Sequence, residues 1–178
     1  MLKILLQIIW FFLPAIMSNM SPIIFRKIPL LNYPVDFNIQ FKGKPLFGKN
    51  KTYRGFFFGI IIAILTIFIQ KTLYPYPNNF SLINYNEINI YLLGFLLGFG
   101  ALFGDILESF FKRRFNIKSG KPWIPFDQID WIIGAILLSS LYLNLSLRIN
   151  ILSIIFLGLF HPLVNIISYE LKLRDDKI

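Results

Sequence analysis

Five long apolar stretches limit what this chain of 178 residues can fold into. An α-helix needs about 20 apolar residues to cross the hydrocarbon core of a bilayer. The five stretches cover residues 4–25, 55–73, 88–111, 129–147 and 149–171. Charged residues make up only 15% of the chain, whereas a soluble domain carries about 25%. The sequence therefore predicts one all-α integral membrane domain over residues 1–178, with five transmembrane helices.

Basic residues gather in three segments outside these stretches. They are Arg26, Lys27, Lys42, Lys44, Lys49, Lys51 and Arg54; Lys112, Arg113, Arg114, Lys118 and Lys121; and Lys172, Arg174 and Lys177. Because consecutive spans alternate in direction, five spans put all three segments on one side, which the positive-inside rule identifies as the cytoplasm. We therefore expect a multi-pass protein of the cell membrane with its N-terminus outside, its C-terminus in the cytoplasm, and cytoplasmic loops over residues 26–54 and 112–128.

The net charge of +9 could serve nucleic acid, an anionic membrane surface or an anionic substrate. Its position beside the spans favours the bilayer and an anionic substrate, and we expect no nucleic-acid partner. Homodimer formation is compatible with the sequence. The chain contains no cysteine, so thiolate nucleophiles, disulfides and metal–thiolate centres are excluded.

Acidic residues flank the second cytoplasmic loop at a helical spacing. Asp105 and Glu108 stand three residues apart near the end of the third apolar stretch, and Asp127 and Asp130 repeat that spacing where the fourth begins. Residues at i and i+3 lie on one helix face. A carboxylate inside a membrane span is costly, about 2.5–3.5 kcal/mol on insertion scales, so it requires a cation, a partner or water.

Two interpretations of these acids compete. In the structural one, they pair with Lys112, Arg113 and Arg114 and fix the helix ends, while other bases bind lipid headgroups. In the chemical one, Asp105, Glu108, Asp127 and Asp130 bind Mg²⁺, with Asp105 and Asp127 as the main ligands. Mg²⁺ prefers hard oxygen ligands, usually one or two carboxylates with waters and substrate phosphates. We favour the second, because lipid binding alone requires no acids.

The first cytoplasmic loop supplies groups that suit phosphate. Its stretch from Lys42 to Gly55 alternates bases with Gly and Pro, and lysine and arginine side chains donate charged hydrogen bonds to phosphate oxygens. The run Gly48-Lys49-Asn50-Lys51-Thr52 lacks the spacing of a P-loop. A solvated loop that only sets membrane orientation is the alternative.

Several motifs in this order resemble those of the archaeal CDP-archaeol synthases. They are Asn19-Met20-Ser21-Pro22, Lys51-Thr52-Tyr53-Arg54-Gly55, Gly104-Asp105, Ser109 to Arg114, Lys118, Gly120, Asp127-Gln128-Ile129-Asp130, and His161-Pro162-Leu163-Val164-Asn165. The resemblance covers nearly the whole chain. The chain is more distantly similar to the CDP-diacylglycerol synthases, from whose signature it departs at Ser119, where that signature has Asp.

The resemblance implies a Mg²⁺-dependent cytidylyltransferase of phospholipid biosynthesis. Its partners would be CTP, an isoprenoid-ether glycerol-1-phosphate lipid and the bilayer, and its products CDP-archaeol (unsaturated) and pyrophosphate. Asp105, Asp127, Lys112 and Arg113 would then be catalytic, at the cytoplasmic face. The groups expected to hold CTP phosphates are Lys49, Lys51, Thr52, Arg54 and Lys118.

Three polar residues within spans, Asn19, His161 and Asn165, either satisfy backbone groups freed by nearby prolines or line a cleft for the lipid phosphate. An anion or phosphate transporter is the alternative from another functional class, although it would place charge through the bilayer rather than at one face. A CDP-diacylglycerol synthase that acts on acyl lipids is the second alternative.

Overall fold

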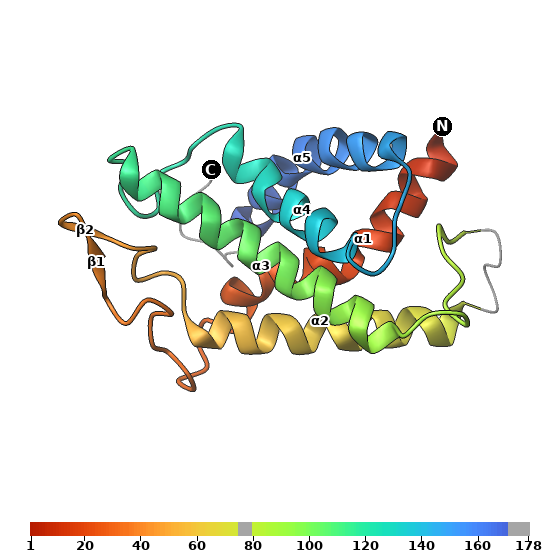
Figure 1. Ribbon diagram of the computed structural model, residues 1–178, viewed down its shortest axis with the longest axis horizontal. Coiled ribbons are helices and arrows are strands. Elements are labelled where there is room, and N and C mark those ends of the chain that lie inside the picture. The colour runs from red at the N-terminus through yellow and green to blue at the C-terminus, as the bar shows by residue number, and fades with distance from the viewer. Residues whose placement is uncertain (75–79, 171–178) are drawn as a thin grey trace.

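The computed structural model describes residues 1–74 and 80–170, without the side chains of residues 161 and 163–168. Within this part the chain forms helices and one small hairpin (Figure 1). The elements are α1 (Leu2–Ile24), β1 (Gln40–Phe41), β2 (Lys44–Pro45), α2 (Tyr53–Leu73), α3 (Ile90–Arg114), α4 (Phe126–Ser139) and α5 (Leu147–Glu170). The prediction of an all-α membrane protein is confirmed.

Three helices of the described chain, α1, α2 and α3, are long and apolar enough to cross a membrane. Their 23, 21 and 25 residues give each a length above about 30 Å at the usual helical rise. The first 14 residues of α5, Leu147–Phe160, form a shorter apolar segment of that helix. Five spans and the inside–outside orientation stay predictions, and the basic tail at 172–177 lies outside the described residues.

The predicted fourth span, 129–147, is wrong at its C-terminal end. Helix α4 has 14 residues and ends at Ser139, so it measures about 21 Å. Turns follow, in which the backbone N–H groups of Tyr142 and Leu143 both donate to the Ser139 carbonyl. From Leu141 to Leu147, within and after these turns, leucines alternate with Tyr, Asn and Ser, a period of two that is typical of extended backbone rather than of a helix.

Helix α3 lies at the centre of the molecule, packed against α1, α2 and α4. Its contact with α4 is a contact between backbones, since a Cβ atom added to Gly100 would lie 2.6 Å from the Gly134 carbonyl oxygen. Small residues allow such close approach of membrane helices. One turn on, Gly104 lies against the Asp130 carbonyl in the same way. This approach sets the distance between the acidic ends of α3 and α4.

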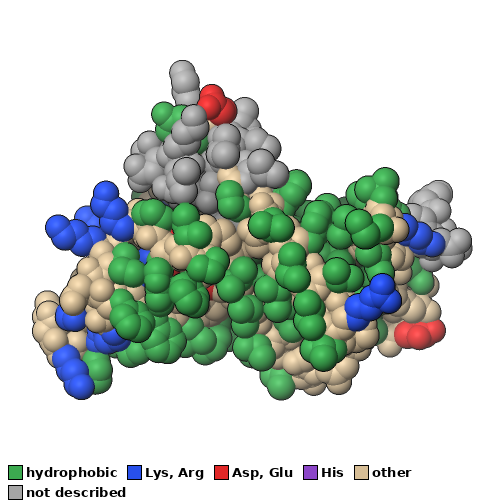
Figure 2. Space-filling view, turned by 90° about the horizontal axis from the view of Figure 1, so that it is seen from above, with side chains coloured by type: hydrophobic (Ala, Val, Ile, Leu, Met, Phe, Trp, Pro, Cys, Tyr) green, Lys and Arg blue, Asp and Glu red, His purple; other side chains and the backbone are tan. Residues whose placement is uncertain are grey.

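Serine hydroxyls link α1 to its neighbours within the apolar layer. Ser18 donates to the Gly98 carbonyl on α3 at 3.0 Å, and Ser21 donates to the Gly55 carbonyl on α2 at 2.8 Å. Outward-facing side chains are apolar, for example Leu65 and Ile69 on α2, which are 55% and 57% exposed. Figure 2 shows hydrophobic side chains across the middle of one face, with lysines and arginines toward the ends. This arrangement suits a lipid environment.

The first loop is folded rather than extended. The Asp36 carboxylate is buried and accepts backbone N–H bonds from Asn38, Phe47 and Gly48 at 2.9–3.0 Å. Burial alone would raise the pKa of Asp36, but these donors outweigh it and lower the pKa below its usual value. At the end of α3, Arg114 donates to the carbonyls of Phe41 and Pro45 in the hairpin. The loop is thus fixed against the end of α3.

Candidate functional site

A cavity of about 310 Å³ lies where the end of α3, the start of α4 and the first loop meet. Its polar wall comes from all three elements, and α1 closes another side. The lining residues are Asn19, Pro22, Ile23, Phe47, Asn50, Lys51, Asp105, Glu108, Ser109, Lys112, Arg113, Ser119, Gly120, Lys121, Pro122, Asp127, Gln128 and Asp130. The ends of α3 and α4, which carry the acids, meet the basic first loop at this cavity, as the sequence predicts.

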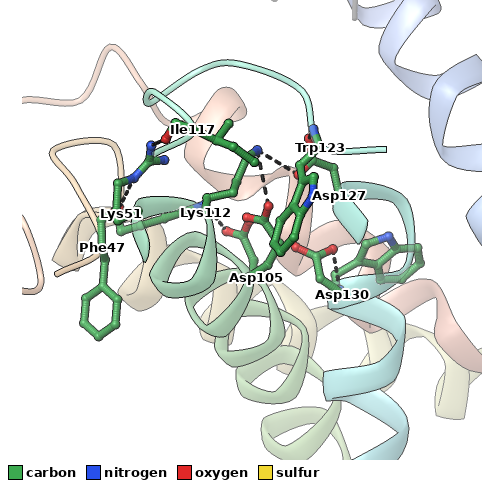
Figure 3. Close-up of polar contacts among 11 residues, drawn as sticks. Phe47, Lys51, Asp105, Lys112, Ile117, Trp123, Asp127 and Asp130 are labelled. Atoms are coloured by element: carbon green, nitrogen blue, oxygen red, sulfur yellow. Dashed lines mark hydrogen bonds and ion pairs between the residues drawn. The ribbon is translucent and has the colours of Figure 1, made fainter. Parts of the chain in front are cut away.

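Three carboxylates form the centre of this cavity. Asp105 and Glu108 lie one turn apart on α3, and Asp130 faces them from α4. One oxygen from each lies within 4.8 Å of the others, which is close enough for a shared cation. Figure 3 shows Asp105, Asp127 and Asp130 turned toward the space between the two helices. Three of the four predicted metal ligands are therefore brought together.

Asp127, the fourth predicted ligand, has a different environment. Its Oδ1 accepts a hydrogen bond from Lys112 Nζ at 2.7 Å, and its Oδ2 accepts one from the Trp123 backbone N–H at 2.7 Å. The same Lys112 ammonium lies 3.3 Å from Glu108 Oε1. Both oxygens of Asp127 are thus engaged, and it holds Lys112 in place between two helices.

A second lysine pairs with the carboxylate group from the loop side. Lys51 Nζ lies 2.6 Å from Asp105 Oδ2, and both side chains are at most one-quarter exposed. Burial would lower the pKa of the Lys51 ammonium, but the adjacent Asp105 carboxylate outweighs burial and raises it, so Lys51 is charged. The acids thus do pair with bases, as the structural interpretation expected, although Lys51 replaces the expected arginines.

Arg113 and Arg114 donate hydrogen bonds to backbone carbonyls instead of pairing with the acids. Arg113 donates through Nε to the Phe47 carbonyl at 3.3 Å and through Nη1 to the Ile117 carbonyl. Arg114 donates to hairpin carbonyls, as described above. Both side chains therefore position the loops around the cavity, and Arg113 also lines it.

A second cavity of about 510 Å³ adjoins the first and shares Arg113 and Ser119 with it. The predicted phosphate ligands Lys49 and Lys118 are exposed and line this second cavity. Asp36, Asn38, Gln40 and Asn116 add carboxylate and amide groups to its wall. Three of the five predicted phosphate ligands therefore line the two adjoining cavities, Lys51 the first and Lys49 and Lys118 the second.

Two other predicted phosphate ligands serve the backbone. Thr52 is the N-cap of α2, where its hydroxyl accepts the Gly55 N–H at 3.3 Å. Arg54 is buried and donates to the Ile28 carbonyl. Neither lines either cavity. Their positions at the first turn of α2 turn both side chains toward the helix end and the incoming loop.

Of the residues predicted for the lipid-phosphate cleft, Asn19 lines the first cavity from α1. The side chains of His161 and Asn165 lie outside the described part. Sequence reasoning missed the roles of Gln128, which is buried in the cavity wall, and of Asp36. Asp36 did carry a signal, because it is the one acid among seven bases in residues 26–54.

The chain is similar to known proteins over almost its full length. The family model described as CarS-like, CDP-archaeol synthase, matches residues 1–177. A CDP-archaeol synthase of Methanocaldococcus jannaschii is 36% identical over 97% of this chain and 97% of its own, and one of Methanococcus maripaludis is 39% identical over 98% and 97%. A solved structure of an intramembrane enzyme for archaeal membrane lipids biosynthesis covers 89% of this chain and 92% of its own, with a TM-score of 0.67 and 26% identity.

Proposed function

This chain belongs to the CDP-archaeol synthase family of membrane cytidylyltransferases, and we propose that it transfers CMP from CTP to an isoprenoid-ether glycerol-1-phosphate in the carboxylate cavity. The observation that carries the proposal is the grouping of Asp105, Glu108 and Asp130 beside Lys51 and Lys112. Acids and bases together suit a metal-bound triphosphate, because the carboxylates neutralise the metal ion and the lysines neutralise the phosphates.

The donor set fits Mg²⁺. Carboxylate oxygens are hard ligands, and an open cavity leaves room for the waters and phosphate oxygens that Mg²⁺ retains. Asp105, Glu108 and Asp130 would hold the ion, whereas Asp127 is committed to Lys112. When bound, Mg²⁺ would neutralise phosphate charge and stabilise the leaving pyrophosphate.

Lys112 is the best placed phosphate-binding side chain. Its ammonium has three N–H donors, of which one donates to Asp127 Oδ1, and it also forms an ion pair with Glu108 Oε1 at 3.3 Å. A remaining donor can bind a phosphate oxygen in the cavity. Because Lys112 is anchored from two helices, its charge stays in one position while substrates bind and leave.

We place the nucleotide across both cavities. Arg113 stands at their junction, where its remaining N–H donors can bind a phosphate. The triphosphate then lies beside the carboxylates, and Lys49 and Lys118 in the second cavity complete the basic surface around the nucleotide. The amide and carboxylate groups of the second cavity can hydrogen-bond to the polar edges of the nucleotide.

The lipid reaches the site from α1, where Asn19, Pro22 and Ile23 line the cavity. A phosphate oxygen of the lipid attacks the α-phosphorus of CTP, and the bond from that phosphorus to the bridging oxygen of the β-phosphate breaks. Pyrophosphate leaves with the bond electrons. The lipid phosphate is already ionised at neutral pH, so the chain has to position and neutralise two anions rather than remove a proton. We place this site at the cytoplasmic face.

The transporter alternative is not favoured. The chain matches a synthase family throughout, and the charged cavity lies at one end of α3 rather than along a path between the helices. Acyl substrates are separated from ether substrates by assay, using geranylgeranyl-ether and diacyl glycerol phosphates in parallel. We expect turnover with the ether lipid to exceed turnover with the acyl lipid.

The test uses the purified full chain with labelled CTP, the ether lipid phosphate and varied Mg²⁺. We expect chelation to stop pyrophosphate release, and Asp105→Asn to lower turnover about 100-fold, the value of roughly 3 kcal/mol of lost charge stabilisation. The matched control is Glu87→Gln. Glu87 lines neither cavity, and its carboxylate accepts a hydrogen bond from Asn84. Normal turnover of Asp105→Asn at limiting Mg²⁺ would remove Asp105 from the metal site.

A further inference from the structure

The Lys51 ammonium lies against the cluster of three carboxylates in which a metal ion would bind. Its Nζ lies 2.6 Å from Asp105 Oδ2, and Asp105 is one of the three acids whose carboxylate oxygens come within 4.8 Å of one another, with Glu108 and Asp130. A divalent ion bound by these three carboxylates would therefore meet a positive charge already bonded to one of its ligands. Two cations this close repel each other, and the repulsion is strong because the pair is largely shielded from water.

The two lysines of the cavity differ in how they are held. Lys112 lies on α3, four residues from Glu108, and also bonds Asp127 on α4, so two packed helices fix it. Lys51 comes from the loop before α2, and Asp105 is the hydrogen-bond acceptor of its ammonium. Its backbone is anchored, since the Lys51 carbonyl accepts the Val35 N–H, yet the four-carbon side chain can swing.

The cavity offers this ammonium a second position. Asn50 and Lys51 both line it, next to the space in which the triphosphate is placed. If Mg²⁺ takes Asp105, the displaced ammonium can bind a phosphate oxygen without any movement of the backbone. The Lys51 charge would thus weaken the binding of a metal ion alone, and it would favour the binding of a metal ion together with its nucleotide.

We propose that Lys51 is an internal counter-ion that holds Asp105 while the site is empty and moves to a nucleotide phosphate when Mg²⁺ and CTP bind together. This rests on the proposed function, because it takes Asp105 as a metal ligand. It goes further in giving the site a binding order: divalent cations bind weakly without nucleotide, and metal and CTP each strengthen the binding of the other.

The test measures metal binding rather than activity. Mn²⁺ serves as the probe, and its free fraction is followed by electron paramagnetic resonance as it is added to nucleotide-free protein in detergent. We expect Lys51→Met to bind Mn²⁺ about 5–150-fold more tightly than the wild type, the usual range for coupling between two sites. Lys51→Gln, which keeps a hydrogen-bond donor for Asp105 without the charge, should show the same direction of change. Lys51→Arg should stay close to the wild type.

Lys49→Met is the matched control. It removes one charge two residues away, from an exposed side chain that lines the other cavity. Nucleotide-free Mn²⁺ affinity should change little. Equal tightening in Lys49→Met and Lys51→Met would overturn the proposal, because a diffuse field would then explain the effect. Unchanged or weaker binding in both neutral Lys51 variants would overturn it as well.

A double variant separates failure of this inference from failure of the proposed function. Asp105→Asn combined with Lys51→Met should lose the tightened Mn²⁺ binding. If it binds Mn²⁺ as tightly as Lys51→Met does, the metal does not use Asp105 and the metal site itself is wrong. If the double variant loses binding while Lys51→Met equals the wild type, the metal site stands and only the counter-ion role of Lys51 is refuted.

Discussion

Replacing Gly104 with alanine is expected to inactivate the site while leaving the helices formed. A Cβ atom at this position would lie 2.8 Å from the Asp130 carbonyl carbon and 3.3 Å from Gly134 Cα. Carbon atoms normally approach to about 3.5–4.0 Å. Both neighbours are backbone atoms, so no side chain can rotate away, and α3 and α4 must separate by about 1 Å locally.

That separation acts directly on the carboxylates. Asp105 follows Gly104 on α3, and Asp130 is the residue whose carbonyl the new methyl group would meet. Misplacement of catalytic groups by 1 Å can lower a rate about 100-fold, whereas overpacking a core typically costs about 1–3 kcal/mol of stability. We therefore expect a loss of turnover of about 100-fold in a protein that still folds.

The assay compares Gly104→Ala with Gly94→Ala, which makes the same change on the same helix ten residues away. A Cβ atom at Gly94 would lie 2.7 Å from Ile67 Cγ2 and 3.1 Å from Ile64 Cα, on the side of α2. Both variants should lower the melting temperature, and only Gly104→Ala should lower turnover strongly. Normal turnover in Gly104→Ala, or an equal loss in Gly94→Ala, would refute the claim that this backbone contact sets the site geometry.

Two other residues allow further tests. Because the pKa of Asp36 is lowered in the folded protein, its carboxylate stabilises the loop above the unfolded pKa of about 3.9, and this stabilisation is lost as pH falls through the folded pKa. Asp36→Asn should cost about 1–3 kcal/mol near neutral pH, and its melting temperature should approach that of the wild type below about pH 4. Lys112→Gln leaves Glu108 and Asp127 without their shared cation, so we expect a loss of about 3 kcal/mol in stability together with loss of turnover. Lys112→Arg should recover stability in the same melting experiment, and an unchanged melting temperature in Lys112→Gln would show that the ion pairs contribute nothing.

The helices could be predicted from the sequence because apolar length decides where a membrane helix forms. The predicted and observed limits of the first three helices agree within three residues. The end of α4 could not be predicted from apolar length. Leu143 and Leu145 are apolar and partly buried against the core, but they reach it from a segment that lies outside any helix. Hydrophobicity alone does not distinguish that case from a continuing helix.

The site could be predicted only as a group of residues. The i, i+3 spacing puts Asp127 and Asp130 near one face of α4, but it also separates them by about 60° and 4.5 Å along the axis. That difference is enough for Asp127 to face Lys112 while Asp130 faces Asp105 and Glu108. Which lysine each acid contacts, and which acids group together, depends on how α3 and α4 pack, and the spacing of residues within one helix carries no such information.

The same packing determines which parts of the site can move. The three expected metal ligands lie on α3 and α4, whose backbones touch at Gly100, Gly104 and Gly134 and leave no space for a shift. Lys51 instead belongs to a loop held by hydrogen bonds that the Asp36 carboxylate accepts and the Arg114 guanidinium donates. A closed packing contact resists displacement over its whole length, whereas a side chain on a hydrogen-bonded loop moves by rotation about single bonds. We therefore expect binding of metal and nucleotide to rearrange the loop side of the cavity against a fixed pair of helices.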